Sequence, residues 1–205
     1  MIKSLRATVF AATASVALLS ASLANAAIYV VNLSGSAESP PNASAGTGTA
    51  TVITDPAAHT LFITLTFSGL TGTTTASHIH AATAVPLTGT AGVATQVPTF
   101  SAFPLGVTSG SFSQTLNTLD LASYNPAYVT ANGGTAASAE AALFAAIGSG
   151  RSYLNIHTSF VPGGEIRGFL VAAPVPELAS WAMMLIGFAG IGAGMRRRPR
   201  ALARV

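Results

Sequence analysis

The sequence predicts an all-β domain, a Greek-key β-sandwich or small barrel of about seven to eight strands with one short inserted helix. Residues 27–173 are rich in Thr, Ser, Gly and Ala, and short stretches of period-two alternation are separated by Gly, Pro and Asn. The chain of 205 residues contains no cysteine, so an apolar core has to stabilise this domain. Apolar segments with adjacent cations flank the domain and predict an N-terminal signal and one C-terminal membrane helix.

Residues 1–26 have the pattern of a secretory signal peptide. Lys3 and Arg6 precede an uncharged stretch at 7–19, and the segment ends in the small-residue motif Ala24-Asn25-Ala26. A basic start, a short apolar run and an A-x-A cleavage site are the parts of such a signal. We therefore expect an exported protein whose folded domain occupies residues 27–173.

Seven stretches of the domain are candidate strands. The clearest is Thr60–Phe67, in which every second residue from Leu61 onward is apolar and therefore lies on one face. Thr49–Thr54 is its expected partner, because Asp and Pro in the intervening segment 55–58 favour a turn. The other candidates are Ile28–Ser36, Ser77–Ala81, Gly110–Leu116, Ser152–Thr158 and Glu165–Val171.

One helix is expected to interrupt the strands, at Ala139–Ile147. Ser138 is a favourable N-cap residue, Glu140 would lie in the first turn, and Gly148 or Gly150 can end the helix. Residues 82–109 contain three prolines and predict a long segment dominated by loops.

Three histidines are candidate metal ligands. His78 and His80 are two residues apart in a candidate strand, so their imidazoles should project to the same side. In the strand 152–158, His157 shares a face with Tyr153 and Asn155, away from the apolar side. Imidazole suits copper and other transition metals. The alternative is a structural role, in which these histidines hydrogen-bond one another and nearby loops.

Glu165 and Arg167 are a second candidate pair. They follow the turn at 162–164 and, in a regular strand, lie on one face, where they could form an ion pair. Whether this face also holds His157 depends on a strand register that the sequence leaves open. His59 lies beside the expected turn at 55–58 and should be solvated.

These motifs together resemble the CHRD family, the domains named for chordin. The resemblance rests on Gly-Thr-Gly-Thr-Ala-Thr-Val at 46–52, Leu-Thr-Phe-Ser-Gly-Leu at 65–70 and Ser-His-Ile-His at 77–80. It continues in Tyr-Leu-Asn-Ile-His-Thr at 153–158 and Pro-Gly-Gly-Glu-Ile-Arg-Gly at 162–168. What the resemblance implies is an all-β extracellular domain without an assigned activity.

The tail, residues 174–205, resembles a PEP-CTERM sorting signal. Its motif at 175–178 is Val175-Pro176-Glu177, with Leu178 in place of a second proline. An uncharged span at 178–195, long enough for a membrane helix, precedes a basic end at 196–205. Under the positive-inside rule this places the domain on the periplasmic side of the inner membrane. The resemblance implies processing by an exosortase-type enzyme and release to the cell surface or exterior.

A weaker likeness is to the copper-zinc superoxide dismutase sandwich, in which an H-x-H strand and a later strand histidine hold copper. His78, His80 and His157 match those roles, whereas the bridging histidine and the zinc-binding loop have no counterpart. The likeness therefore implies a mononuclear site and not a two-metal dismutase.

Charge and motifs narrow the function further. Of the nine lysines and arginines only Arg151 and Arg167 lie between residues 27 and 173, so the domain is mildly acidic and nucleic acid is excluded as a partner. No nucleophile elbow or phosphate loop is present. We expect a non-enzymatic cell-envelope module that binds polysaccharide or protein, with a copper-type metal-binding protein as the alternative.

Overall fold

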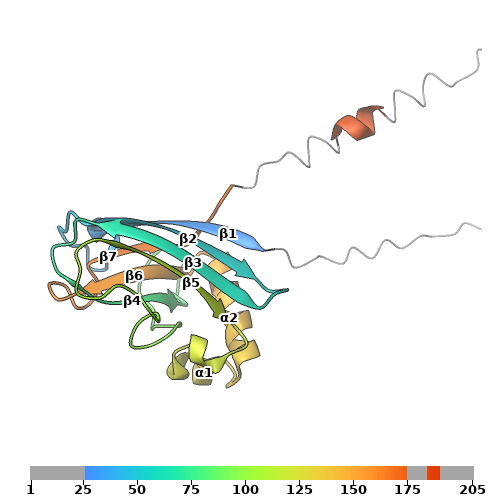
Figure 1. The fold of residues 1–205 in the computed structure, drawn as a ribbon. Helices are drawn as coiled ribbons and strands as arrows, with labels where there is room; N and C mark the ends of the chain where they lie inside the picture. The colour runs from blue at the N-terminus through green and yellow to red at the C-terminus, as the bar shows by residue number, and fades with distance from the viewer. Residues whose placement is uncertain (1–25, 175–183, 190–205) are drawn as a thin grey trace, which may run out of the picture.

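The computed structural model describes residues 26–174 and 184–189. Figure 1 shows a curled antiparallel sheet with helices at one end. The strand order is β4-β6-β7-β1-β2-β3-β5, and β8 pairs with β1. The elements in chain order are β1 (Ala27–Ser34), η1 (Gly35–Ala37), β2 (Thr47–Asp55), β3 (Thr60–Ser68), β4 (Thr74–Ala81), β5 (Gly110–Asn117), η2 (Leu121–Ser123), α1 (Pro126–Ala131), α2 (Ala136–Gly148), β6 (Ser152–Thr158), β7 (Ile166–Phe169) and β8 (Val171–Ala172).

The all-β class and the candidate strands are confirmed. β2 and β3 pair from Thr47↔Ser68 to Asp55↔Thr60, and the Asp55 carboxylate closes their turn by accepting hydrogen bonds from two backbone amides. The last candidate is divided into β7 and β8, which bond to different stretches of β1. Two connections, from β3 to β4 and from β4 to β5, cross between opposite ends of the sheet order.

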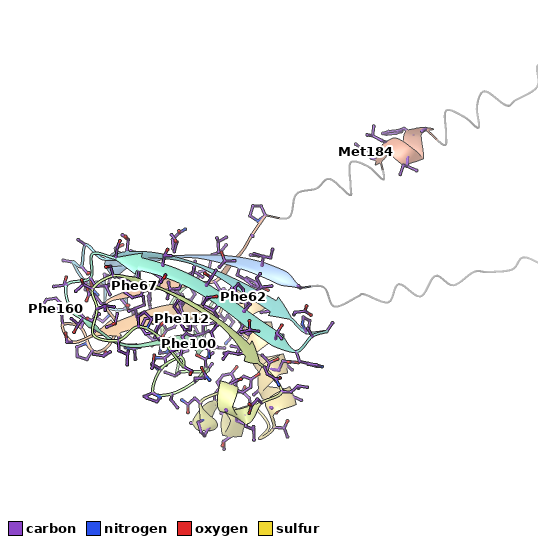
Figure 2. The ribbon with its side chains drawn as sticks, in the orientation of Figure 1. Phe62, Phe67, Phe100, Phe112, Phe160 and Met184 are labelled. Atoms are coloured by element: carbon purple, nitrogen blue, oxygen red, sulfur yellow. The ribbon has the colours of Figure 1, made fainter. Side chains whose placement is uncertain are left out.

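The apolar core lies between the two halves of the curled sheet. Strand alternation buries one face of every long strand, as in β3, where Leu61 and Ile63 are fully buried. Phe100, from the segment 82–109, is also fully buried and stacks on Phe112 of β5 at 5.5 Å between ring centroids (Figure 2). The expected loop-rich segment is therefore part of the core as well as of the surface.

The same segment covers the free edge of β4. Backbone hydrogen bonds join Ala94 N–H to the Ile79 carbonyl, Phe100 N–H to the Ser77 carbonyl, and Thr74 N–H to the Val107 carbonyl. An exposed strand edge offers unpaired donors and acceptors to other chains. Here the backbone of the segment 82–109 pairs with several donors and acceptors of the β4 edge, although it forms no regular strand.

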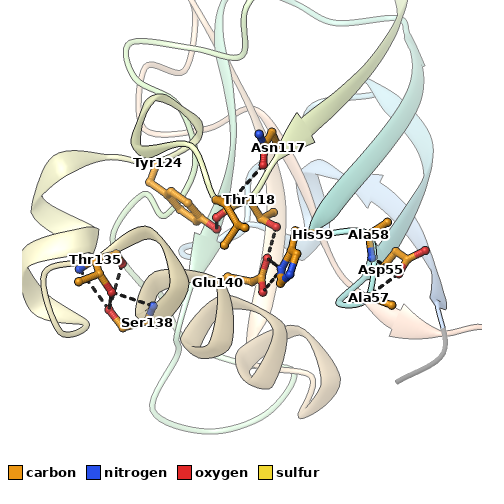
Figure 3. Close-up of polar contacts among 11 residues, drawn as sticks. Asp55, Ala57, Ala58, His59, Asn117, Thr118, Tyr124, Thr135, Ser138 and Glu140 are labelled. Atoms are coloured by element: carbon orange, nitrogen blue, oxygen red, sulfur yellow. Dashed lines mark hydrogen bonds and ion pairs between the residues drawn. The ribbon is translucent and has the colours of Figure 1, made fainter. Parts of the chain in front are cut away.

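The prediction of one helix starting at Ala139 is wrong in number and in start. Thr135, not Ser138, caps α2, and the Ser138 side chain completes a reciprocal capping box (Figure 3). Glu140 consequently lies beyond the first turn and is buried. α1 was missed although Asn125 caps it and Pro126 begins it, which is a standard helix-start signal. Its six residues are too few for helical periodicity to show.

Most of the two terminal predictions lie outside the described residues. This applies to the signal at 1–25, the sorting motif at 175–178 and most of the expected span at 178–195. Within that span the structure describes a short helix at 184–189. Among the described residues no helix has both the length and the apolar character needed to cross a bilayer.

Candidate metal centre

The outer face of β4, β6 and β7, here called the histidine face, brings the three histidines together. Ile79 points into the core, so its neighbours His78 and His80 project outward, as predicted. β6 pairs with β4 so that His157 lies opposite Ala76 and Asn155 opposite His78. The register therefore places imidazoles from two adjacent strands on one surface.

The three rings form a compact triangle. Ring centroids are 5.8 Å apart for His78 and His80, 5.2 Å for His78 and His157, and 5.9 Å for His80 and His157. One ring nitrogen of each histidine lies within 4.8 Å of those of the other two. His78 and His80 are buried, and His157 is partly exposed, which leaves it at the solvent side of the cluster.

Each imidazole donates one N–H to a backbone carbonyl from a covering loop. His78 Nε2 donates to Pro98 at 2.7 Å, His80 Nδ1 to Ala91 at 2.9 Å, and His157 Nδ1 to Pro162 at 2.9 Å. Because a carbonyl only accepts, these bonds fix the tautomers.

The opposite ring nitrogens are His78 Nδ1, His80 Nε2 and His157 Nε2. All three are buried and without a hydrogen-bond partner among the described residues. In the neutral tautomer each carries a lone pair.

Burial keeps these imidazoles neutral. The pKa of His80 falls from 6.5 to about 4, mainly because burial desolvates the ring. The hydrogen bond to Ala91 opposes this shift, and the charges that His157, His78 and Arg167 can carry add to it. Burial also lowers the pKa values of His78 and His157, each against its carbonyl hydrogen bond. A neutral imidazole is the form that ligates a metal.

A transition-metal ion fits this donor set. Zn–N bonds are about 2.0–2.1 Å long, so two nitrogens on one ion lie at most about 4.2 Å apart. Small ring rotations therefore bring nitrogens that lie within 4.8 Å into range. The carbonyl bonds are the partners that orient metal-bound histidines. Three protein ligands leave a coordination position open.

Tyr153 and Arg167 extend the cluster along the face. The Tyr153 ring stacks on His80 with centroids 4.7 Å apart, and the Arg167 guanidinium lies 4.7 Å above Tyr153. Arg167 also donates to the Ala37 and Gly89 carbonyls. The register Asn155↔Arg167 places Arg167 on the face of His157, which the sequence left open.

The expected ion pair between Glu165 and Arg167 is absent from the described residues. Glu165 precedes β7 and follows Gly164, whose φ of +132° interrupts the strand, so two-residue alternation does not extend to it. The fully buried carboxylate accepts hydrogen bonds from the Ser44 and Thr158 hydroxyls and from the backbone amides of residues 71 and 72. Burial alone raises its pKa, but these bonds hold the pKa of Glu165 below 4.5.

Glu38 is the acidic partner of Arg167, and sequence reasoning missed it. Its Oε2 lies 3.8 Å from Arg167 Nε, while Oε1 is buried without a partner, as is Asn155 Oδ1. Both side chains approach Gly164, where a Cβ would clash with them. Burial raises the pKa of Glu38 to about 7, although the charge of Arg167 opposes this. The available signal in the sequence was that Glu38 is the only ionisable residue in a stretch of small residues and prolines.

His59 does not join the cluster and is not simply solvated. Its Nδ1 donates to the Glu140 carboxylate at 3.0 Å, and the Thr118 hydroxyl donates to the same carboxylate (Figure 3). The His59 side chain remains 44% exposed. These bonds attach the β2–β3 turn to α2, so the fourth histidine is structural.

A model of the CHRD domain matches residues 29–170, which is more than half of the chain and includes the whole histidine face. No curated protein and no solved structure matches the chain significantly. CHRD domains are typical of extracellular and secreted proteins. The resemblance drawn from the motifs is thus confirmed for the domain, while the sorting signal stays a prediction. The chain belongs to the CHRD domain family.

Proposed function

We propose that this protein is an extracellular module that binds one transition-metal ion through His78, His80 and His157. Two observations carry the proposal. One nitrogen from each of the three rings lies within 4.8 Å of the others, and each ring has one buried nitrogen without a partner among the described residues. Buried polar atoms are nearly always paired, so three unpaired acceptors in one place call for a ligand.

A metal ion explains this arrangement better than a hydrogen-bond network among the side chains. None of the three imidazoles donates a hydrogen bond to another, because the single N–H of each neutral ring donates to a backbone carbonyl. A single water molecule has two hydrogens to donate and leaves one of the three nitrogens unsatisfied. One cation can accept all three lone pairs.

The donor set favours copper or zinc over magnesium or calcium. All three ligands are imidazole nitrogens, which suit copper and zinc, whereas magnesium and calcium prefer oxygen. Copper is the strongest binder among the divalent first-row metals. A bound ion would supply Lewis acidity at its open position. Glu38, whose pKa burial raises to about 7, is linked to the cluster only indirectly, through Arg167 and Tyr153.

The direct test is metal content. The protein, purified from its full-length gene, is stripped with a chelator, reloaded with Cu²⁺ or Zn²⁺, dialysed and analysed for metal. We expect about one ion per chain, lost in His78→Ala and in His157→Ala. His59→Ala is the matched control and should keep its metal, because His59 lies outside the cluster.

A spectroscopic measurement on the wild-type protein tests the ligand type without relying on variants that could misfold. The Cu²⁺ form of the wild-type protein should give an electron paramagnetic resonance signal with nitrogen hyperfine structure. Less than half an ion per chain in the wild type, on the order expected for surface binding, overturns the proposal. Equal metal loss in His59→Ala does the same.

We propose further that the module reaches its place through the two terminal segments. The support is sequence alone: a signal with an A-x-A site at 1–26 and a sorting-type tail at 174–205. An exosortase-type enzyme would process the tail at the inner membrane. The mass of the mature protein tests this, because Glu177→Ala should leave the tail attached. An unchanged mature mass contradicts the proposal.

A further inference from the structure

A second surface of the molecule carries regular rows of uncharged polar side chains. It is the outer face of β1, β2, β3 and β5, here called the hydroxyl face. Strand register aligns its residues into rows, because each outward position lies opposite an outward position of the next strand. Three rows, in which every residue except Val30 is polar, are Ser34–Thr47–Ser68, Asn32–Thr49–Thr66–Ser111 and Val30–Thr51–Thr64–Ser113.

This face lacks the charges that normally keep an exposed sheet soluble. Of the outward residues on the four strands, only Asp55 is ionisable, and it lies at the end of β2. Protein surfaces usually carry charged residues on about 25–35% of positions, and exposed sheets often use lysine to prevent association. A broad uncharged face therefore points to a partner that is itself uncharged.

Apolar side chains continue the face at one end. Ile28, Val30 and Val171 are 50%, 44% and 51% exposed, and Val30 lies opposite Val171. Figure 2 shows side chains that project from the outside of this layer. Phe62 of β3 belongs to the same outward set, because it is only partly buried between the buried Leu61 and Ile63. The face thus offers hydroxyl groups and apolar patches side by side.

Two shallow hollows mark where a ligand would lie. One is lined by residues of β2 and β3 at the Ser68 end, and the other crosses from Asn32 to Thr64. Thr49 and Thr66 line both hollows, and their hydroxyls are 3.1 Å apart. Thr49 and Thr66 therefore connect the two hollows of the hydroxyl face.

We propose that the hydroxyl face binds an extended, uncharged polysaccharide. Outward side chains repeat at about 4.8 Å across the strands and about 6.8 Å along them, which gives a flat lattice of donors and acceptors. A neutral glycan presents hydroxyls at regular intervals and C–H faces between them. The hydroxyls match the threonine and serine rows, and the C–H faces match the threonine methyls and the valines. A charged polymer finds no counter-charge on this face.

The test uses retention of the full protein on amorphous cellulose and on chitin, with alginate as the charged comparison. The wild type should be retained on at least one neutral glycan and not on alginate. The double variant T49K/T66K should weaken retention about tenfold or more, since it removes two hydroxyls and introduces charge. Thr130→Lys, on the exposed side of α1, is the matched control and should bind as the wild type does.

Conservative variants separate hydroxyl recognition from general disturbance of the strand. Thr66→Ser keeps the hydroxyl and should retain binding, whereas Thr66→Val keeps the shape and should weaken it several-fold, about the value of one hydrogen bond. His78→Ala should bind glycan normally, so failure of the metal proposal and failure of this one are distinguishable.

Three outcomes overturn the inference. The first is no retention on either neutral glycan, and the second is equal retention on alginate. The third is an equal loss in Thr130→Lys. If thermal hysteresis in freezing solutions accompanies the first outcome, the face is assigned to ice instead.

Discussion

The histidine face and the hydroxyl face both arise from two-residue alternation along the strands, but loops cover the first and solvent surrounds the second. On both, two-residue alternation sends polar side chains away from the core. The histidine face is covered by the segment 82–109 and by the loops at 35–46 and 159–165, which contact it through backbone carbonyls. No part of the chain that the structure describes covers the hydroxyl face, and its outward side chains are exposed or partly exposed.

This difference decides what an unpaired polar atom means on each face. On the hydroxyl face an unpaired hydroxyl is satisfied by water. On the histidine face five buried atoms have no partner within residues 26–174, namely Glu38 Oε1, His78 Nδ1, His80 Nε2, Asn155 Oδ1 and His157 Nε2. Leaving such a group unpaired costs about 1–3 kcal/mol. Loops that cover a polar face thus turn ordinary outward strand residues into buried groups that need a partner.

The largest expected effect comes from Glu165, whose carboxylate joins Ser44 of the loop at 35–46 and the backbone of residues 71 and 72 to the end of β6. Glu165→Ala should lower the free energy of unfolding by about 4 kcal/mol, because it leaves two hydroxyls and two backbone amides unpaired in the interior. Denaturant unfolding measures this. Asp55→Ala, which removes an exposed carboxylate with two amide partners, should cost only about 1 kcal/mol.

The pH dependence of this effect has a defined sign. The folded-state pKa of Glu165 lies below 4.5, so its stabilisation is fully present above that pH and is lost as the pH falls. The difference between wild type and Glu165→Ala should therefore shrink on acidification. A difference that grows on acidification would contradict the hydrogen-bond account.

Glu38 should behave in the opposite way. Its folded pKa of about 7 lies above the ordinary 4.5, so the folded protein loses stability as the pH rises through this window. Glu38→Gln should be more stable than the wild type by about 3 kcal/mol above neutral pH, and this gain should vanish near pH 4.5. Thermal unfolding across that range is the measurement. If Glu38→Gln is instead less stable than the wild type above neutral pH, the ion pair between Glu38 and Arg167 dominates.

Metal binding should stabilise the covered face by a similar amount. At a free metal concentration about 100-fold above the dissociation constant, unfolding should cost about 2.7 kcal/mol more than in chelator. Because burial lowers the pKa of all three imidazoles from 6.5, the stabilisation should persist at pH values somewhat below 6.5, where ordinary imidazoles are protonated. Calorimetry with and without Zn²⁺ tests this. Loss of the effect around pH 6.5 would contradict the burial of His80.

The smallest expected effect on stability lies on the open face. Thr49→Lys should change the free energy of unfolding by no more than about 0.5 kcal/mol, since its side chain faces solvent. The same variant should weaken glycan retention, which separates function from stability. A loss above about 2 kcal/mol would show that the hydroxyl row is structural.

The sequence predicted the strands and outward side chains that follow from local alternation. It did not predict the contacts that loops make when they fold over the histidine face. Thr60–Phe67 and Ser152–Thr158 were found because their apolar residues repeat every second position, and the three outward histidines follow from the same repeat. Pro98 and Ala91 carry no side-chain signal, since they act through carbonyls that only the folded loop positions. Glu38 became a site residue through an Arg167 contact 129 positions away.

The segment 82–109 closes the β4 edge and also supplies the carbonyls that orient His78 and His80. Protection against fibril growth and control of the imidazole tautomers therefore share one stretch of chain. A change that loosens this stretch would expose the edge of β4 and, at the same time, disturb the orientation of His78 and His80, the proposed metal ligands. Aggregation and failure to take up metal should thus arise together in the same defective molecules.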